Sequence, residues 1–211
     1  MLAGLVASGA TTGLDQWAVE HAMPLAAGPG FAPTTTESIV PLFHAPFHPP
    51  GVAVTQIVVL PGQVVFSLLL VLAAASRLWT RGRAESAVWL TAAWFVAVGV
   101  EVVFRHTLTR EPLQRDGVHL VGFDRSWPSG HALRCALVVV ALSAASPRLR
   151  LPLAIWLVAV VVLLELASFH TPTDVAGGLL LATAAAAGAA ALERSGLLRR
   201  RAGLGRGRAG T

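Results

Sequence analysis

The sequence predicts an all-α fold, a polytopic membrane bundle of five spanning helices. Composition is the first reason, because 55% of the 211 residues are hydrophobic and only 13% are charged, about half of the roughly 25% typical of soluble domains. The second reason is that long apolar segments recur along the chain with short polar links between them. A soluble chain needs more polar surface to cover its core, so lipid is the expected solvent. With one cysteine, the composition also excludes disordered chains and disulfide scaffolds.

Residues 1–53 are expected to form an N-terminal interfacial helix and an extracytoplasmic loop. Between residues 12 and 23, four apolar side chains repeat at helical spacing, namely Leu14, Trp17, Ala18 and Ala22. Asp15 and Glu20 lie off that stripe. A helix of this kind lies in the membrane interface, and a partial sixth span is the alternative. Residues 24–51 are rich in proline and glycine, which indicates an exposed loop.

Residues 54–192 contain the apolar segments that predict the membrane helix bundle. A spanning helix needs about 20 mostly apolar residues, and the five candidates are 54–76, 86–104, 132–146, 151–169 and 175–192. The third candidate is short and needs the residues on either side of it to complete a crossing. Residues 193–211 follow as a basic, flexible cytoplasmic tail that holds six of the 16 arginines.

The arginines predict which side of the membrane each link faces, because short cytoplasmic links collect basic residues. They gather after the first, third and fifth spans, at Arg77, Arg81, Arg83, Arg148, Arg150 and the tail. This side is expected to be the cytoplasm, with the chain in the cell (plasma) membrane. Residues 105–128 and 169–174 then face the extracytoplasmic side. The tail has no aromatic residue, which favours anionic lipids over nucleic acid as its partner, and no obligatory protein partner is expected.

The strongest local signal is Pro128-Ser129-Gly130-His131, at the start of the third span. Proline suits a first helical turn, and the small residues Ser129 and Gly130 leave backbone N–H groups open at the positive end of the helix dipole. Such a terminus binds phosphate. His131 would direct a titratable nitrogen at the bound anion.

A second polar group, His170-Thr171-Pro172-Thr173-Asp174, opens the fifth span. His170 and Asp174 are four residues apart, a spacing that lets side chains meet on a helix. A carboxylate that fixes one imidazole nitrogen makes the other a better nucleophile. The alternative is an ordinary capped helix start, because Thr171 can cap and Pro172 can open the helix.

Arg105 and Arg110 emerge at the outer end of the second span, on the same side as both histidines. Glu101 lies one turn before Arg105 and can hold its guanidinium. The two arginines are therefore candidates for binding a phosphate. The alternative is that they anchor the end of the span in the interface.

These residues resemble the type 2 phosphatidic acid phosphatase family, the membrane lipid phosphatase branch related to the vanadium haloperoxidases. Three motifs mark that family: Lys, six residues, Arg-Pro; then Pro-Ser-Gly-His; then Ser-Arg, five residues, His, three residues, Asp. The second motif is intact at residues 128–131, and the third supplies His170 and Asp174. The resemblance covers about residues 86–192 and implies a metal-independent phosphatase without cofactors.

Three departures from the family pattern concern its basic residues. Lysine is absent, so only an arginine can fill its place, and Arg105 is separated from Arg110 by four residues where the family has six. Arg110 is followed by a glutamate before the proline. The Ser-Arg pair of the third motif is replaced by Leu163 and Leu164.

Arg134 is a candidate for the missing charge. It lies one helical turn inside the third span from His131, and Glu165 lies slightly more than one turn inside the fourth span from His170. The two helices run antiparallel, so both charges are expected at similar depth, and charges inside a bilayer normally pair. Glu165 is therefore predicted to hold Arg134 near the phosphate, with a purely structural ion pair as the alternative.

The resemblance implies hydrolysis of a lipid phosphomonoester or pyrophosphate through a phosphohistidine intermediate. His170 would attack phosphorus, Asp174 would orient its ring, and His131 would protonate the departing oxygen. The groups that would hold the substrate phosphate are Arg105, Arg110, Arg134 and the backbone of Ser129 and Gly130. A polyprenyl pyrophosphate, a phosphatidic acid or a phosphatidylglycerophosphate would fit. The alternative is a catalytically degenerate member that binds lipid phosphates without turnover.

Overall fold

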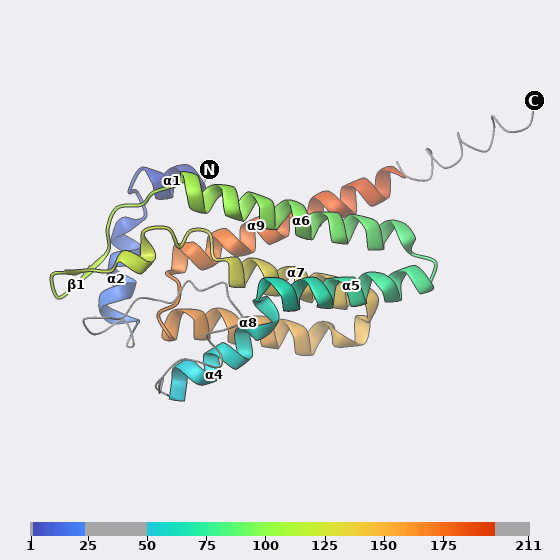
Figure 1. Ribbon diagram of the computed structural model, residues 1–211, viewed down its shortest axis with the longest axis horizontal. Helices are drawn as coiled ribbons and strands as arrows, with labels where there is room; N and C mark the ends of the chain where they lie inside the picture. The colour runs from blue at the N-terminus through green and yellow to red at the C-terminus, as the bar shows by residue number, and fades with distance from the viewer. Residues whose placement is uncertain (1, 24–49, 197–211) are drawn as a thin grey trace, which may run out of the picture.

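The helices of the chain lie side by side in an elongated bundle (Figure 1). The computed structural model describes residues 2–23 and 50–196. The α-helices in these ranges are α1 (Leu2–Ala7), α2 (Thr12–His21), α4 (Pro50–Val59), α5 (Val64–Thr80), α6 (Ala84–Thr107), α7 (Gly130–Ala145), α8 (Arg150–Leu166) and α9 (Pro172–Ser195). The shorter elements are the 3-10 helices η1 (Leu60–Gly62), η2 (Val121–Phe123) and η3 (Pro147–Leu149) and the strands β1 (Gln114–Arg115) and β2 (Val118–His119). The described chain is thus mostly helical, as predicted, with one small hairpin added.

Within the described residues, three helical segments are long and apolar enough to cross a membrane: α6, α9 and the segment Pro147–Leu166, which joins η3 to α8. The predicted first span is bent by 51° between Val54–Gly62 and Val64–Thr80, and it is a fourth candidate if the bent pair is one crossing. The bend follows from η1, whose Leu-Pro-Gly sequence is followed by extended backbone at Gln63 (ψ 146°). The predicted third span, α7, has only 16 residues. Five complete spans are therefore not confirmed for the described residues.

The short helix α7 lies at the centre of the bundle. It packs against α5, α6, α8 and α9, and ten of its 16 residues are buried. Small residues let its neighbours approach closely, and a Cβ on Gly178 of α9 would collide with the carbonyl oxygen of Ser129. The starts of α7 and α9 consequently lie against each other. Because longer helices enclose it, α7 does not itself have to match the thickness of a bilayer.

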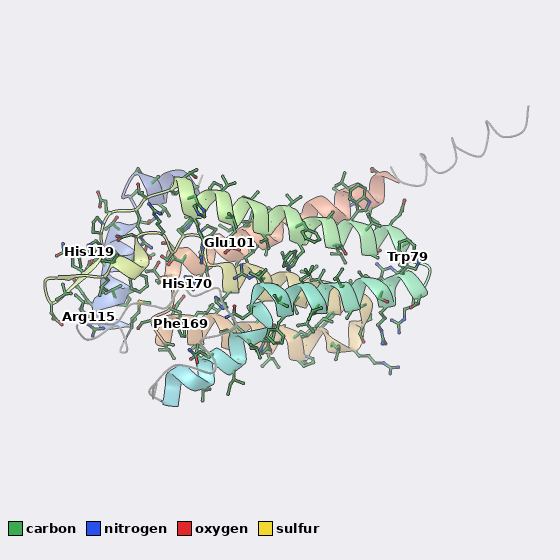
Figure 2. The ribbon with its side chains drawn as sticks, viewed as in Figure 1. Trp79, Glu101, Arg115, His119, Phe169 and His170 are labelled. Carbon is green, nitrogen blue, oxygen red and sulfur yellow. The ribbon has the colours of Figure 1, made fainter. Side chains whose placement is uncertain are left out.

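The C-terminus of α7 is covered by arginines from the last turn of α5 and from the link after it. Arg77 Nε donates to the carbonyl oxygen of Ala145 (3.3 Å), and Arg81 NH1 donates to the same atom (2.6 Å). The last carbonyls of a helix have no partner within the helix, and the guanidiniums also meet the negative end of its dipole. Trp79 marks this end of the bundle and His170 the other (Figure 2), so these arginines and the predicted site lie at opposite ends.

The N-terminal segment forms two short helices, α1 with six residues and α2 with ten. A turn at Gly9 (φ 74°) joins them, and neither reaches the length of a span, so the alternative of a sixth span is not supported. Leu14 and Trp17 of the predicted stripe are 55% and 56% exposed, as on a helix that lies in the membrane interface. Another face of α2 is turned toward the bundle, and Asp15 is fully buried there. The burial of that carboxylate was not predicted.

A hairpin between α6 and α7 holds the N-terminal helix in place. Asp116 and Gly117 form its two-residue turn with φ of 52° and 76°, the positive values that a tight hairpin turn needs. The Gln16 side chain of α2 bonds both the N–H (3.0 Å) and the carbonyl oxygen (2.5 Å) of Gln114. A small apolar cluster joins the same parts and consists of Val19, Met23, Leu113, Leu120 and Phe123. The N-terminal helix is thus fixed to the link that leads into α7.

Two predicted parts of the chain fall largely outside the described residues. The loop at 24–51 is described only from residue 50, where α4 begins, and residues 197–211 hold every tail arginine except Arg194. The last helix ends at Ser195, and Gly196 follows in the left-handed conformation (φ 62°), a common way to end a helix. The loop, the tail and the segment boundaries at 53/54 and 192/193 remain predictions.

Candidate active site

The starts of α7 and α9 bring the two predicted motifs together at one end of the bundle. The Ser129 hydroxyl caps α7 by accepting from the Ala132 N–H (3.3 Å). The Ser129 N–H donates to the backbone carbonyl oxygen of Asp174 in α9 (2.9 Å). This bond fixes the two helix starts against each other. It also means that the Ser129 N–H is not open to a phosphate, contrary to the prediction.

The start of α9 is a capped helix that also carries a histidine–aspartate pair. Thr171 and Asp174 form a capping box, in which Asp174 Oδ2 accepts from the Thr171 N–H (3.0 Å). His170 Nδ1 lies 3.6 Å from the same oxygen, slightly beyond hydrogen-bond distance. The two interpretations of this segment are therefore compatible, because one carboxylate both caps the helix and faces the imidazole.

Asp174 is fully buried, and both of its carboxylate oxygens have donors. Oδ1 accepts from Arg110 NH1 (3.0 Å). Oδ2 accepts from Ser126 Oγ (2.6 Å) as well as from the backbone of Thr171. Ser126 was not predicted, because a single serine in a loop carries no pattern. A carboxylate held from three directions keeps a fixed position beside His170.

His131 and His170 face each other across the two helix starts. Their ring centroids are 6.3 Å apart and their planes are inclined by 51°. His131 Nε2 and His170 Nδ1 are buried and have no hydrogen-bond partner among the described residues. His170 Nδ1 has Asp174 Oδ2 as a neighbour at 3.6 Å. Buried polar atoms are normally paired, so the unpaired Nε2 of His131 beside the His170 ring indicates a site for a polar ligand. Figure 2 shows His170 at the same end of the bundle as Glu101.

Glu101, and not Glu165, pairs with Arg134. Arg134 NH1 lies 2.7 Å from Glu101 Oε2, and Arg134 Nε donates to the carbonyl oxygen of Gly62 (2.6 Å). The predicted pairing with Glu165 is wrong, because the Arg134 side chain is directed toward α6 and η1, whereas Glu165 lies half-buried on α8.

The Glu101 carboxylate joins two guanidiniums. Glu101 Oε1 lies 3.4 Å from Arg105 Nε, the contact that their spacing of one helical turn predicted. Gly130 leaves the space for this group, because a Cβ there would collide with Glu101 Oε1 and would lie 2.7 Å from Arg134 NH1. Two arginines from different helices are thus held at the start of α7, close to His131.

The position at which the family pattern has an arginine is apolar in the fold as well. Leu164 is fully buried in a cluster whose other members are Val59, Ala132, Cys135, Val160 and Val175. Side chains from α4, α7, α8 and α9 fill this space. Within the described residues, α8 therefore contributes packing at this depth and no guanidinium.

Arg110 is held between two carboxylates. Its NH1 donates to Asp174 and to Thr171 Oγ1 (3.2 Å), and its NH2 pairs with Asp15. Asp15 also accepts from Thr173 Oγ1 (2.5 Å) and from the Thr173 N–H (3.2 Å). Burial raises the pKa of Asp15 above its usual value, and the Thr173 hydroxyl and the Arg110 charge oppose that rise. Arg110 was predicted to bind a phosphate, but its NH1 and NH2 point at carboxylates in this structure.

Asp15 is a residue of the site that the sequence pattern did not predict. It precedes Arg110 by 95 residues and Thr173 by 158. An aspartate on the polar side of an amphipathic helix predicts exposure to solvent. Only the packing of α2 against the start of α9 shows that this side is buried.

Residues 101–194 match the family model of the PAP2 superfamily. This match is consistent with a member of the type 2 phosphatidic acid phosphatase family. The PAP2 range begins at Glu101 and includes both facing histidines, Asp174 and Arg134, whereas Asp15 precedes it. Together with the three helices of the described residues that are long enough to cross a membrane, this match indicates a membrane protein and supports a phosphatase-type function. No curated protein and no solved structure matches the chain.

Two other histidines of the PAP2 range have local partners. His106 is exposed, and its Nδ1 bonds the carbonyl oxygen of Val102 (2.7 Å). His119 Nε2 lies 2.9 Å from Asp124 Oδ1 in the link before α7. Among residues 2–23 and 50–196, no group of three or more His, Cys, Asp and Glu side chains is arranged to hold a metal ion.

Proposed function

We propose that the chain is an integral membrane lipid phosphate phosphatase that works through a phosphohistidine on His170. The observation that carries the proposal is the pair of imidazoles His131 and His170, whose ring centroids are 6.3 Å apart. Among the described residues the buried Nε2 of His131 has no hydrogen-bond partner, and His170 is buried. One such group can attack phosphorus while the other protonates the departing oxygen. The match of residues 101–194 to the PAP2 superfamily model supports the phosphatase class of this chemistry.

His170 is the proposed nucleophile. Its Nδ1 lies 3.6 Å from Asp174 Oδ2, which leaves Nε2 for the phosphorus atom. A proton on Nδ1 that is donated to the carboxylate selects the tautomer with a lone pair on Nε2. The 3.6 Å separation is expected to shorten in the substrate complex, because catalytic hydrogen bonds are often long in free enzymes. Attack forms the N–P bond and breaks the P–O bond to the departing group.

His131 is the proposed general acid and base. In the first step its protonated ring gives a proton to the departing oxygen. In the second step it takes a proton from water, which attacks phosphorus as the N–P bond breaks, so that phosphate and free His170 result. His131 lies in the first turn of α7, where the helix dipole stabilises the charge that develops on the phosphate oxygens.

Arg105 and Arg134 are the proposed phosphate-binding cations, and Glu101 positions both. Glu101 lies 3.4 Å from Arg105 Nε and 2.7 Å from Arg134 NH1. Arg105 and Arg134 thus place two guanidiniums at the start of α7, where they can attract a phosphate. The start of α7 at Gly130 adds the positive end of its dipole. Arg110 is not included among the phosphate-binding cations, because its guanidinium contacts two carboxylates.

The proposed substrate is the phosphate or pyrophosphate headgroup of a lipid at the extracytoplasmic surface. Arg77 and Arg81 at the opposite end of the bundle support this orientation, because basic residues mark cytoplasmic links. A site at the other end of α7 then lies near the boundary between membrane and water, where a headgroup can reach it while the lipid tail stays in the bilayer. Polyprenyl pyrophosphates, phosphatidic acids and phosphatidylglycerophosphates share this chemistry.

Leu164 favours a second candidate, a degenerate member that binds lipid phosphates without turnover. Leu164 lies in an apolar cluster at the position where the family pattern has an arginine, so the guanidinium is missing there. Stabilisation of charge is a main part of the catalysis of phosphoryl transfer. Under the first candidate, Arg134 supplies that charge from α7. Under the second, Arg134 and Glu101 form an ion pair with no part in chemistry.

Phosphate release by the purified protein in detergent distinguishes the two candidates. The substrates are a phosphatidic acid, a phosphatidylglycerophosphate and a polyprenyl pyrophosphate. The parent is expected to hydrolyse at least one of them, and His170→Ala to do so about a thousandfold more slowly, as for loss of a catalytic nucleophile. His106→Ala is the control, because this histidine is exposed and stands outside the site. Binding of the lipids without release of phosphate would favour the second candidate.

Formation of the proposed phosphohistidine can be measured separately from phosphate release. Acid-labile, base-stable label is expected on the parent after rapid quenching of a reaction with a radiolabelled lipid phosphate, and it is expected to be missing from His170→Ala. His131→Ala is expected to slow formation of the label from substrates with a poor leaving group. Undiminished phosphate release by His170→Ala would exclude the phosphohistidine mechanism.

A further inference from the structure

We propose that Asp15 of the N-terminal helix α2 is a positioning residue for the reaction, which acts on His170 through Arg110 and Asp174. The proposal rests on the proposed function, because it gives Asp15 a part in the chemistry at His170. Asp15 lies outside the residues that match the PAP2 superfamily, 101–194. The catalytic group would thus depend on a carboxylate that the matched region does not contain.

A continuous line of contacts runs from Asp15 to His170. Asp15 pairs with Arg110 NH2, and Arg110 NH1 lies 3.0 Å from Asp174 Oδ1. The other oxygen of Asp174 lies 3.6 Å from His170 Nδ1. Each of the four side chains is at most 6% exposed. Water therefore screens these interactions little, and a change of charge at one end is felt at the other.

Arg110 carries one positive charge between two carboxylates. With Asp15 in place, the group of Asp15, Arg110 and Asp174 keeps one net negative charge. That charge holds the Nδ1–H of His170 and stabilises the positive charge that develops on the ring as it attacks phosphorus. Without the charge of Asp15, the guanidinium balances Asp174 alone and draws its carboxylate away from His170.

The docking of α2 does not depend on Asp15 alone. Gln16 bonds both backbone groups of Gln114 in the hairpin, and Arg115 NH1 donates to the carbonyl oxygen of Met23 (2.7 Å). Met23 is also part of the apolar cluster that joins α2 to the link before α7. Replacement of Asp15 by asparagine, which has nearly the same shape, is therefore expected to remove the charge while α2 stays in place.

Steady-state kinetics of Asp15→Asn in the full chain test the proposal. We expect kcat to fall about 10- to 100-fold, as when a catalytic group is slightly misplaced. KM is expected to stay within about twofold, because uniform substrate binding is unchanged while Arg105 and Arg134 hold the phosphate. Glu20→Gln is the matched control, since Glu20 is an exposed carboxylate on the same helix, and it is expected to keep both constants.

Three further measurements separate positioning from stability. The melting temperature of Asp15→Asn is expected to lie within a few degrees of that of Glu20→Gln. Asp15→Glu, which keeps the charge, is expected to recover part of the lost kcat. The double variant Asp15→Asn/Arg110→Gln is expected to be no slower than Arg110→Gln, because residues that act along one path have non-additive effects.

The outcomes distinguish this proposal from the proposed function. A parental kcat in Asp15→Asn, with an active parent, overturns the role of Asp15 and leaves the phosphatase intact. The role of Asp15 is also overturned if the loss of kcat equals the loss of folded protein, or if the effects in the double variant are additive. Both results leave the phosphatase proposal intact. A parent that releases no phosphate from any of the three lipids overturns the proposed function, and the role of Asp15 with it.

Discussion

Gly130 shows how one missing side chain makes room for a charge in the interior of the bundle. The Glu101 carboxylate occupies the place where a Cβ on residue 130 would lie. Glu101 then reaches Arg134 and Arg105 at once. A glycine at the first position of α7 is therefore needed for the ion pairs beside it, in addition to any close approach of a phosphate to its backbone.

Gly130→Ala is expected to displace the Glu101 carboxylate and to destabilise the fold by about 2–4 kcal/mol, because a buried ion pair loses its geometry. Phosphate release should fall with it. The control is Gly188→Ala in α9, where nothing lies within 4 Å of the new Cβ. This variant is expected to be neutral or to stabilise the helix by up to about 1 kcal/mol. Unfolding by denaturant in detergent measures both, and equal effects would contradict the packing described for Gly130.

The two glutamates give a second prediction at this scale. Glu101→Gln is expected to lower kcat/KM by about tenfold or more, since two guanidiniums lose the group that positions them. Glu165→Gln, which removes a half-buried carboxylate of α8 that does not pair with Arg134, is expected to lower kcat/KM less than Glu101→Gln does. Assays of both variants on one lipid phosphate decide between them. A larger loss in Glu165→Gln than in Glu101→Gln would contradict the assignment of Glu101.

The sequence could predict that His131, His170 and Asp174 are candidate site residues, because their signals are local: a four-residue motif and a spacing of one helical turn. The partner of Arg134 could not be predicted in the same way. Glu101 and Glu165 lie on two helices that both pack against α7, and the choice depends on how α7 is rotated about its axis. Asp15 depends on a still longer range contact, between α2 and the start of α9.

At the scale of elements, a long apolar segment predicts a helix more accurately than a short one does. The predicted spans 86–104 and 175–192 lie entirely within α6 and α9. The prediction for 54–76 missed the bend at η1, although Pro61 and Gly62 were visible in the sequence. The hairpin was missed because each strand has only two residues, too few for an alternating pattern to be recognised.

Gln16 gives a prediction for the docking of α2. Gln16→Ala removes two hydrogen bonds to the backbone of Gln114, which is expected to lower the free energy of opening of α2 by about 1–2 kcal/mol. Hydrogen exchange of residues 12–21, followed by mass spectrometry, measures this change. Gln114→Ala is the matched control, because only the backbone of Gln114 takes part. Similar protection of α2 in Gln16→Ala and in the parent would show that the hairpin does not hold it.

At the scale of the whole molecule, the two ends of the bundle have different chemistry, and labelling can assign them to sides of the membrane. Cys135 is the only cysteine and is buried, so the parent is expected to resist a membrane-impermeant maleimide. Val118→Cys in the hairpin (51% exposed in the parent) is expected to react in intact cells. Leu149→Cys in η3 (41% exposed in the parent) is expected to react only after lysis. The reverse pattern would contradict the proposed orientation.

The 16 residues of α7 have one more consequence. At 1.5 Å per residue the helix is about 24 Å long, whereas the hydrocarbon core of a bilayer is about 30 Å thick. With His131 at one end and the arginine-covered carbonyls at the other, both ends cannot lie at the surfaces of an undistorted bilayer. Because longer helices enclose α7, the lipid need not thin to match it. With the arginine-covered end at one surface, the histidines then lie below the other surface, at a depth that grows with the thickness of the bilayer. Phosphate release in vesicles is therefore expected to be faster in lipids with short acyl chains than in lipids with long ones, so that bilayer thickness itself would set how easily a headgroup reaches the histidines.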